Sequence, residues 1–596
     1  MTSEASPIVG VESIPLWIGT PDRPLFAWLD VPDDGLVAGA AVICPSMGLE
    51  AAYSSRTLRT LARRLAGARW AALRLDYAAT GDSVGSWTDP DLVGEWLGSI
   101  RFAVDTLRSH GAPRLGIVGL RLGATLAAAE LARGGPVDDL VLWDSCPTGK
   151  AFLREQRALF AFRRQMAVEW GIATEEGIES RVDLQVEGLV EAPGAVFSPA
   201  TAAALEPLAV AGSDRVLAAR ELILSRQDKR LGRILEDRLT LPHVESSAVV
   251  GQEELFDERP VTPVPTLDRI VSWFSEADGP LGPLTAPEQL PMAVHRAPGR
   301  PSVRERPVAI GPAQLFGVLT EPEGDLHQSA PTVVFLNVGL IAHHGPGRLW
   351  VELARAAAAA GQVRCLRVDL SGLGDSPTRP GRTEMRQFPS DAAEDMEDIR
   401  RFAAAGGAPL IVMGVCSGAD HAIEMGLAGP VASICVINPA LRFLRWGGAK
   451  DSAKPGQIEW EERTTWGEKG RLLSRAMDVF EPVRGMTRFI PAPGWWVVKR
   501  WFMPSSPVRT LEHLVQNGVD ILVVVGSGEA RRVYRGEQHR LHSLVARGGA
   551  HLETVPHLDH SLLERTSHDQ VAELFGNYVA RRVAELSGAT ASAARP

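Results

Sequence analysis

A cysteine lies at the centre of a short glycine-bounded motif, GVCSG (414–418). An apolar run typical of a β-strand precedes the motif, and a helical pattern follows it. A Gly-x-Xaa-x-Gly turn between a strand and a helix is a nucleophile elbow, which exposes its central side chain. The helix N-terminus behind it favours a thiolate. We therefore expect Cys416 to be a nucleophile rather than a small buried apolar residue, and the Ser417 amide to serve an oxyanion hole.

A cysteine nucleophile needs a base, and the base is expected after the last strand-like segment, LETVP (552–556). His560 follows that segment at the right place, and His557 is a weaker alternative. An acid that orients the imidazole is expected beyond ILVVVG (521–526), where Glu529 is the carboxylate available. The nucleophile, acid and base then follow one another along the chain in the order that this type of elbow requires.

The first part of the chain repeats the pattern without its chemistry. Two pairs of segments align: AALRLDYAATGDS (71–83) with RCLRVDLSGLGDS (364–376), and VGLRLGA (118–124) with MGVCSGA (413–419). The first copy has Arg121 at the centre of its elbow, and arginine is not a nucleophile. The window that corresponds to His560, VVGQEELFDE (249–258), has no histidine. The first copy is therefore expected to be degenerate. Three roles remain open for it: a purely structural domain, an anion-binding site built on Arg121, or an activity that does not use a catalytic triad.

Both copies alternate apolar strand-like runs with helical patterns of 10–15 residues, which predicts parallel sheets covered by helices on both faces. The expected fold class is α/β, with two tandem domains that each have a mostly parallel central sheet and a lid insertion. The predicted boundaries are a degenerate first half (1–280), a Pro/Gly-rich linker (281–305), a second half with the Cys416 elbow (306–585) and a flexible tail (586–596).

Four motifs of the second half resemble those of the α/β-hydrolase superfamily. They are NVGLIAHHGPGR (337–348), LRVDLSGLGDS (366–376), GVCSGA (414–419) and INPAL (437–441). These motifs resemble a bacterial branch of serine-aminopeptidase-like and exosortase-system-associated hydrolases. The resemblance implies an α/β-hydrolase fold and places the catalytic histidine in the Asp559-His560 pair.

The resemblance also implies a second oxyanion donor in the loop after TVVFLN (332–337), at Val338 or Gly339. The family's usual His-Gly is replaced there, which leaves open which of the two amides donates. Asn337, in the same loop, is expected to contact the substrate. Arg348 is expected either to clamp a substrate carboxylate or phosphate, or to cap the adjoining helix and pair with an acid.

Tryptophan gathers in the predicted lid of the second half, residues 440–510. We expect Trp495 and Trp496 to line a pocket for a hydrophobic acyl group, although the lid can instead bury a small core of its own. The segment PGWWVVKRWFMP (493–504) mixes bulky apolar residues with two basic ones, which suits peripheral contact with a membrane. Six of the fifteen tryptophans lie in this lid, at positions 446, 460, 466, 495, 496 and 501.

The composition narrows the possible partners. A net charge of −10 and a pI near 5.9 argue against nucleic-acid binding. No signal peptide or transmembrane segment is visible, and an odd count of five cysteines argues against a disulfide framework. We expect a cytoplasmic protein. The histidines and cysteines lack the spacing of a metal site and no phosphate-binding glycine loop is visible, so neither a metal nor a cofactor is expected.

These observations favour an acyl-cysteine hydrolase that cleaves an ester or thioester of a hydrophobic, small-molecule acyl substrate, either free or bound to a carrier. Two alternatives remain at this stage. One is an acyltransferase or cyclase of secondary-metabolite or polysaccharide biosynthesis that uses the same Cys-Glu-His triad. The other is a binding or scaffolding protein in which both halves are inactive.

Overall fold

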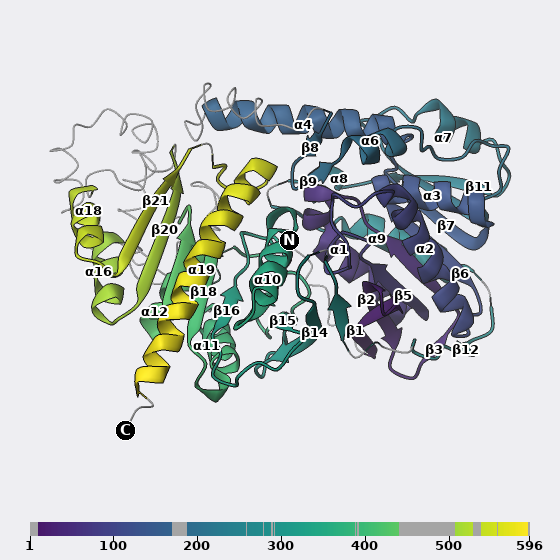
Figure 1. Ribbon diagram of the computed structural model, residues 1–596. Helices are drawn as coiled ribbons and strands as arrows, with labels where there is room; N and C mark the ends of the chain where they lie inside the picture. Colours follow the sequence, from purple (N-terminus) through teal and green to yellow (C-terminus); the bar gives the residue numbers. More distant parts are fainter. Residues whose placement is uncertain are drawn as a thin grey trace, which may run out of the picture.

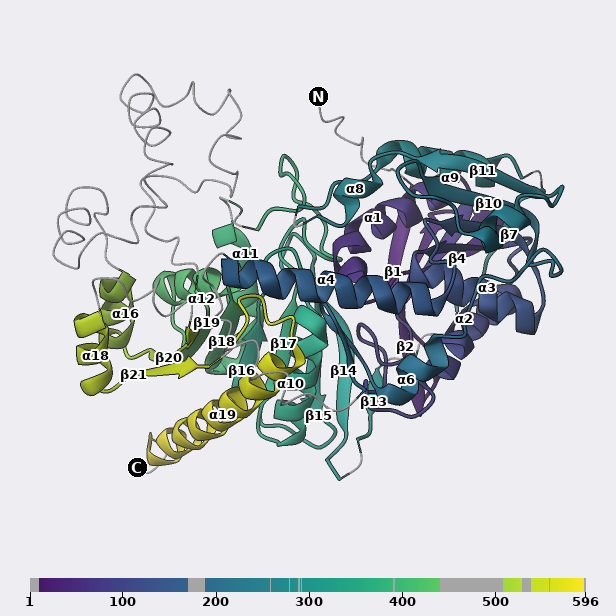
Figure 2. The same ribbon diagram turned by 90° about the horizontal axis from the view of Figure 1, so that it is seen from above.

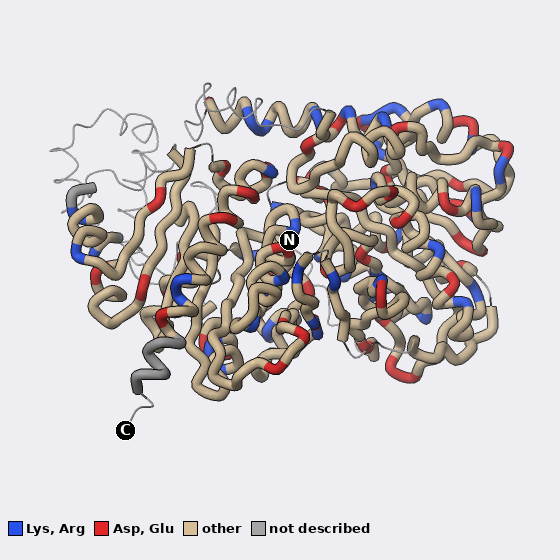
Figure 3. Tube along the Cα trace, in the orientation of Figure 1, with Lys and Arg blue, Asp and Glu red and all other residues tan. Residues whose placement is uncertain are grey.

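The computed structural model describes residues 10–169, 188–439, 507–527 and 538–593, apart from single positions within these ranges. Two sheets flanked by helices lie side by side, one built from each half of the chain (Figure 1). Charged residues of both signs are spread over both halves (Figure 3). In the described part of the chain, no helix is both long and apolar enough to cross a membrane.

The first sheet has eight strands in the order β1-β2-β5-β4-β6-β7-β10-β11. Its first two ladders, β1 with β2 and β2 with β5, are antiparallel, and the remaining ladders are parallel. The strands are β1 (Val11–Thr20), β2 (Arg23–Pro32), β4 (Gly39–Cys44), β5 (Trp70–Leu75), β6 (Leu115–Leu120), β7 (Val137–Trp143), β10 (Ala218–Arg226) and β11 (Val244–Val249).

Helices cover both faces of the first sheet, because their apolar stripes are buried against it. One face is covered by α1 (Gly48–Gly67) and α9 (Val264–Ser275), and the other by α2 (Leu92–Ser109) and α3 (Leu122–Gly134). After β7 the chain forms the long helix α4 (Gly149–Glu169) and the hairpin β8 (Val190–Ala192)–β9 (Ala195–Phe197). These elements occupy the place at which a lid is expected.

The second sheet has nine strands in the order β13-β14-β15-β17-β16-β18-β19-β20-β21. It is antiparallel from β13 to β17 and parallel from β17 to β21. The strands are β13 (Ala293–His295), β14 (Val303–Ile310), β15 (Leu315–Pro322), β16 (Thr332–Phe335), β17 (Arg364–Val368), β18 (Leu410–Val415), β19 (Ser433–Ile437), β20 (Asp520–Gly526) and β21 (Ala550–Val555).

The second sheet is likewise buried between two layers of helices. One layer holds α10 (Leu349–Ala359) and α19 (Arg565–Ala593), and the other holds α11 (Ala392–Ala403), α12 (Ser417–Ala428), α16 (Pro507–Gln516) and α18 (Gln538–Ala546). The fold class predicted from the sequence is therefore confirmed: the protein is α/β, with mostly parallel sheets between helices.

The predicted linker and the predicted tail both contain secondary structure. In the predicted linker 281–305, β12 (Gly282–Pro283) pairs with β3 (Leu36–Val37), and β13 pairs with β14 at the edge of the second sheet. Ala293 within it is fully buried in an aromatic cluster, which explains why this stretch is held in place. Helix α19 also continues into the predicted tail 586–596, as far as Ala593.

The two halves meet through reciprocal contacts. Arg56 of α1 donates to the carbonyls of Gly374 and Ser376 in the second half. Arg348, just before α10, donates to the carbonyls of Gly81 and Ser83 at the corresponding turn of the first half. An arginine of each half thus donates hydrogen bonds to the corresponding turn of the other half, residues 81–83 or 374–376. Interfaces between two similar subunits have the same reciprocal arrangement.

A buried ionic network crosses the same junction. His343 lies between two carboxylates, with Nδ1 2.7 Å from Asp369 Oδ2 and Nε2 2.8 Å from Asp82 Oδ2 of the first half. Burial alone would lower the pKa of His343, but the two carboxylates outweigh it and raise the pKa to about 10. Arg367 also pairs with Asp82 and, 2.9 Å away, with Glu305. The imidazolium and guanidinium therefore balance carboxylates that burial would otherwise penalise.

Candidate active site

The elbow of the second half has the backbone conformation that its sequence predicts. The chain leaves β18, turns at Cys416 with φ 52° and ψ −112°, and enters α12. A Cβ on Gly414 would lie 2.0 Å from the Gly418 carbonyl oxygen, and one on Gly418 would lie 2.4 Å from the Asn337 carbonyl oxygen. Both positions therefore require glycine, and the strained turn presents the Cys416 side chain at the edge of the sheet.

The structure brings His560 to Cys416. The two side chains are 144 residues apart in the chain, and His560 Nε2 lies 3.3 Å from Cys416 Sγ. This is within hydrogen-bond reach for a sulfur atom, as a base and its nucleophile require.

Asn438 holds the loop that carries His560, and the sequence reasoning missed it. Its Nδ2 donates to the carbonyls of Asp559 (3.2 Å) and His560 (3.1 Å), while its Oδ1 accepts from the Gly526 amide (3.0 Å). The asparagine thereby ties the ends of β19 and β20 to the histidine loop. Its place in the INPAL run, directly after β19, was the available clue.

Cys416 differs from the other four cysteines in its environment. It is partly exposed, whereas Cys44, Cys146, Cys365 and Cys435 are buried. Burial raises the pKa of the Cys44 and Cys435 thiols to about 12, and it raises those of the other two buried thiols as well. Cys416 is therefore the cysteine best placed to react with a reagent from solution.

The predicted oxyanion residues lie beside the elbow. Ser417 is the first residue of α12, and the first amides of a helix have no acceptor within the helix. Gly339 lies next to it, but its amide donates to Ser417 Oγ at 2.9 Å, so it would have to exchange that partner for an oxyanion. Val338 is buried and accepts at its carbonyl from the Ile341 amide.

Two residues predicted to contact the substrate are engaged in hydrogen bonds within the protein. Asn337 is buried, and its amide group is used internally: Nδ2 donates to Asp369 Oδ1 and the Ile341 carbonyl, and Oδ1 accepts from the Leu370 amide. Among the described residues, Arg348 forms no ion pair with an acid, and its side chain does not cap α10. Its Nε, Nη1 and Nη2 donate to three carbonyls of the first half, those of Gly81, Gly85 and Ser83. Both residues therefore stabilise the structure around the site.

Several predicted residues lie outside the described part of the chain. They include the proposed acid Glu529 and the alternative base His557. The same holds for Trp495 and Trp496, for the segment 493–504 and for most of the lid 440–510, of which only the start of α16 is described.

The first half contacts the loop that carries His560. Its helix α4 extends across the second half (Figure 2), and its hairpin β8–β9 lies against residues 563–565. Glu191 of β8 accepts from the Arg565 amide at 2.9 Å, and the Gly194 amide donates to the Leu563 carbonyl at 3.3 Å. The histidine loop is thus supported from both halves.

The elbow of the first half has nearly the same backbone conformation but different side chains around its central residue. Arg121 adopts φ 55° and ψ −119° at the N-terminus of α3. Its guanidinium contacts Glu155 and lies 3.3 Å from Glu50 and 3.6 Å from Asp144 Oδ2. Three carboxylates of the protein thus surround the cation, which argues against the anion site considered from the sequence.

Two groups of side chains have the proximity that a metal site needs among the described residues. They are Asp82 with His343 and His344, and His343 with Asp369 and Asp375. Both groups share His343, whose two nitrogens already lie against carboxylates. An imidazolium held in this way has no lone pair to offer a metal.

Comparisons with known proteins agree with this architecture. Residues 333–574 match the model of the alpha/beta hydrolase family, which supports placing this part of the chain in the α/β-hydrolase superfamily. None of the curated proteins matches the chain.

Many solved structures share a distant likeness with the chain. An α/β serine hydrolase without a lid from Xanthomonas campestris is 16% identical, with a TM-score of 0.28, over 45% of this chain and 97% of its own. An esterase from Rhizomucor miehei is 17% identical, with a TM-score of 0.29, over 48% of this chain and 86% of its own. Proline iminopeptidase from Mycobacterium smegmatis is 15% identical, with a TM-score of 0.27, over 47% and 99%.

Proposed function

We propose that the second half is an acyl-cysteine hydrolase that acts on esters or thioesters of hydrophobic acyl groups. The observation that carries the proposal is the 3.3 Å approach of His560 Nε2 to the partly exposed Cys416 Sγ at a nucleophile elbow. The family match of residues 333–574 supports the hydrolase class. The tryptophan content of the lid supports an apolar acyl group.

The proposed reaction has two steps, acylation of Cys416 and hydrolysis of the acyl-enzyme. Cys416 Sγ attacks the acyl carbonyl while its proton passes to His560 Nε2, and a carbon–sulfur bond forms. The tetrahedral oxyanion is stabilised by backbone amides at the elbow, with Ser417 as the first donor. The intermediate collapses, the leaving group takes the proton from His560, and an acyl-thioester remains. Water then attacks this thioester, passes its proton to His560 and releases the acid and the thiol. Glu529 is the proposed partner that orients the imidazole.

In this proposal the first half is not catalytic. Arginine at its elbow cannot attack a carbonyl, and the guanidinium of Arg121 is held by carboxylates. Its part is to support the loop that carries His560, through β8 and β9.

Intact mass spectrometry tests the proposal directly. The native chain is incubated with a short acyl thioester, and we expect the mass of one acyl group to appear on the protein and then to decay as free acid is released. Cys416→Ala should show no adduct, while Cys435→Ala, which changes a buried thiol, should behave as the native chain. An adduct retained on Cys416→Ala would contradict the assignment of the nucleophile. Added amines or alcohols that divert the acyl group from water would identify an acyltransferase.

Alkylation separates an enzyme from a scaffold. Iodoacetamide at neutral pH should label Cys416 far faster than the four buried cysteines, and His560→Ala should slow that labelling. Equal labelling of all five cysteines would indicate a binding protein with no active thiol.

A further inference from the structure

Helix α4 is basic in a protein that is acidic as a whole. The chain has a net charge of −10, whereas α4 holds five basic residues and two acidic ones. Among the described residues one of the five, Arg164, has a carboxylate partner, and the other four form no salt bridge. Glu155, one of the two acids, is already paired with Arg121 and Lys229. The cations of α4 are thus available to an anionic partner. The five basic residues are Lys150, Arg154, Arg157, Arg163 and Arg164.

Three of the unpaired cations form one exposed face of α4. Lys150, Arg154 and Arg157 are exposed and follow one another at intervals of four and three residues. Side chains with that spacing lie on the same side of a helix. Two large apolar side chains are exposed further along α4, Leu159 at 38% and Phe162 at 59%. Arginine and aromatic residues are both enriched where proteins bind one another, so this basic face has the composition of a protein interface.

The basic face lies beside the proposed catalytic site. Helix α4 extends across the second half (Figure 2), and Arg164 Nε lies 3.8 Å from Glu564 Oε1. Glu564 follows His560 by four residues in the same loop. Arg157 is two turns before Arg164, about 10 Å along the helix axis. A partner bound to α4 is therefore next to the loop that carries the proposed base.

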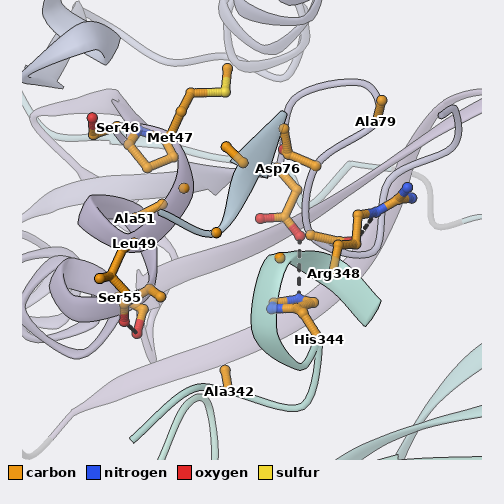
Figure 4. Close-up of a pocket in the computed structure, with 18 of the residues that line it drawn as sticks. Ser46, Met47, Leu49, Ala51, Ser55, Asp76, Ala79, Ala342, His344 and Arg348 are labelled. Atoms are coloured by element: carbon orange, nitrogen blue, oxygen red, sulfur yellow. Dashed lines mark hydrogen bonds and ion pairs between the residues drawn. The ribbon is translucent and has the colours of Figure 1, made fainter. Parts of the chain in front are cut away.

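The hollow between the two halves is a different place. A cavity of about 250 Å³ lies there, where Asp76 of the first half points toward His344 of the second (Figure 4). None of Cys416, Ser417 and His560 lines it. The cavity is therefore separate from the proposed catalytic site, and an acyl group bound for Cys416 must be delivered elsewhere. The exposed face of α4 is accessible to a partner as large as a protein.

The small apolar area favours a protein over an anionic membrane as this partner. A helix that lies in a membrane interface buries a continuous apolar face. In α4, however, Phe152 and Leu153 are buried within the first half, which leaves Leu159 and Phe162 as its exposed large apolar side chains. Two such side chains suffice for the apolar centre of a protein contact that has a charged rim.

We propose that α4 is the docking surface for an acidic carrier protein that holds the acyl group as a thioester. The proposal rests on the proposed hydrolase function and names the partner that brings its substrate. Acidic side chains of the carrier pair with Lys150, Arg154 and Arg157, and an apolar side chain of the carrier packs on Phe162.

The transfer from the carrier to the enzyme exchanges one thioester for another. Cys416 Sγ forms a bond to the acyl carbonyl carbon while its proton passes to His560 Nε2. The bond between that carbon and the sulfur of the carrier then breaks, and the carrier leaves as a thiol with the proton from His560. Hydrolysis of the acyl-cysteine releases the free acid, as in the proposed reaction.

One acyl group presented in two ways tests the proposal. The probes are octanoyl-pantetheine and the same thioester attached to a bacterial acyl carrier protein, which is small and acidic. At low ionic strength and equal concentrations, we expect the native chain to release octanoate at least about tenfold faster from the carrier, and added salt should reduce this advantage. Equal rates would overturn the docking and leave the hydrolase standing. No release from either probe would contradict the proposed function, and the docking with it.

Charge reversal on α4 locates the docking surface. Arg154→Glu and Arg157→Glu should each lose most of the advantage of the carrier and keep the native rate with octanoyl-pantetheine, because both side chains are exposed. Phe162→Ala should lower the rate with the carrier by at least about fivefold. Arg300→Glu, an exposed change between β13 and β14, is the matched control and should keep both native rates. An undiminished advantage of the carrier in Arg154→Glu and Arg157→Glu would refute docking on α4.

Binding to a membrane is the competing outcome. Vesicles of phosphatidylcholine and phosphatidylserine are sedimented with the native chain, which should stay in the supernatant. Sedimentation of the native chain that Arg157→Glu abolishes would assign the basic face to an anionic membrane and overturn the proposal.

Discussion

The two elbows of this protein share a backbone and differ in chemistry. Cys416 and Arg121 have nearly the same φ and ψ, 52° and −112° against 55° and −119°. The glycine before each centre is equally constrained, since a Cβ on Gly119 would lie 2.4 Å from the Ala124 Cα. The strained turn therefore does not depend on a catalytic residue. It is imposed by the close packing of the strand against the helix that follows it.

What differs between the elbows is the set of side chains that faces the centre. In the second half, Asn438 follows β19 and holds the loop of His560. In the first half, Asp144 follows β7 and lies 3.6 Å from Arg121. The second half thus has a neutral amide after β19, where the first half has a carboxylate after β7 that belongs to the ion cluster of Arg121.

Removing the cation of the first elbow should have the largest effect. Arg121→Ala removes the cation that Glu50, Asp144 and Glu155 share, although Glu155 keeps Lys229 at 3.8 Å. The loss of one partner from a buried pair costs about 3–5 kcal/mol. Urea unfolding should show this loss in the free energy of unfolding. Arg121→Lys keeps the charge and should lose less. An Arg121→Ala protein as stable as the native chain would show that the ion cluster is not structural.

Replacing Asn438 with aspartate, the residue at the corresponding position 144 of the first half, should lower the reactivity of Cys416. Asn438→Asp removes the Nδ2 donor and places a carboxylate beside the carbonyls of Asp559 and His560, at a cost of about 2 kcal/mol for the lost and unpaired groups. We expect the alkylation rate of Cys416 to fall by about tenfold as the histidine loop loosens. Asn517→Asp, at the exposed end of α16, is the control. An unchanged rate would mean that Asn438 does not position His560.

The junction between the halves should weaken at high pH. Because the pKa of His343 is about 10 in the folded chain and about 6.5 when unfolded, its stabilising effect is complete below pH 6.5 and is lost as the pH rises through 10. Thermal unfolding at pH 7 and pH 10 should show a fall in Tm that is smaller in His343→Gln. His327→Gln, at an exposed position, should keep the native fall. Equal falls in all three proteins would exclude His343 as the cause.

The support from the hairpin should have the smallest effect. Glu191→Ala removes the acceptor of the Arg565 amide, which is worth about 1 kcal/mol. Faster hydrogen exchange in residues 558–565 should report the change, and Glu191→Gln, which retains an acceptor, should restore protection. Exchange that is the same in all three proteins would show that β8 does not hold this loop.

The fold class and the proximity of Cys416 to His560 could both be predicted from the sequence. Both depend on regular features: alternating strands and helices, glycines that only one turn allows, and a base that must follow the last strand. The spacing of these features along the chain fixes which ends of strands lie together.

The sequence was misleading where the partner of a residue lies in the other half. Arg348 follows the motif of a substrate loop, yet its acceptors are carbonyls more than 260 residues earlier in the chain. His343 and Asp82 are likewise far apart in sequence and 2.8 Å apart in space. Contacts between two packed halves leave no periodicity in either, so motif reasoning within one half cannot find them.

The hydrogen bonds of Arg56 and Arg348 across the junction bear on how the two halves associate. Because each half carries its own complementary surface, the polypeptide between β12 and β13 serves mainly to raise the effective concentration of one half near the other. A chain nicked there should stay together as a heterodimer, and the tether would then matter most when the protein is dilute.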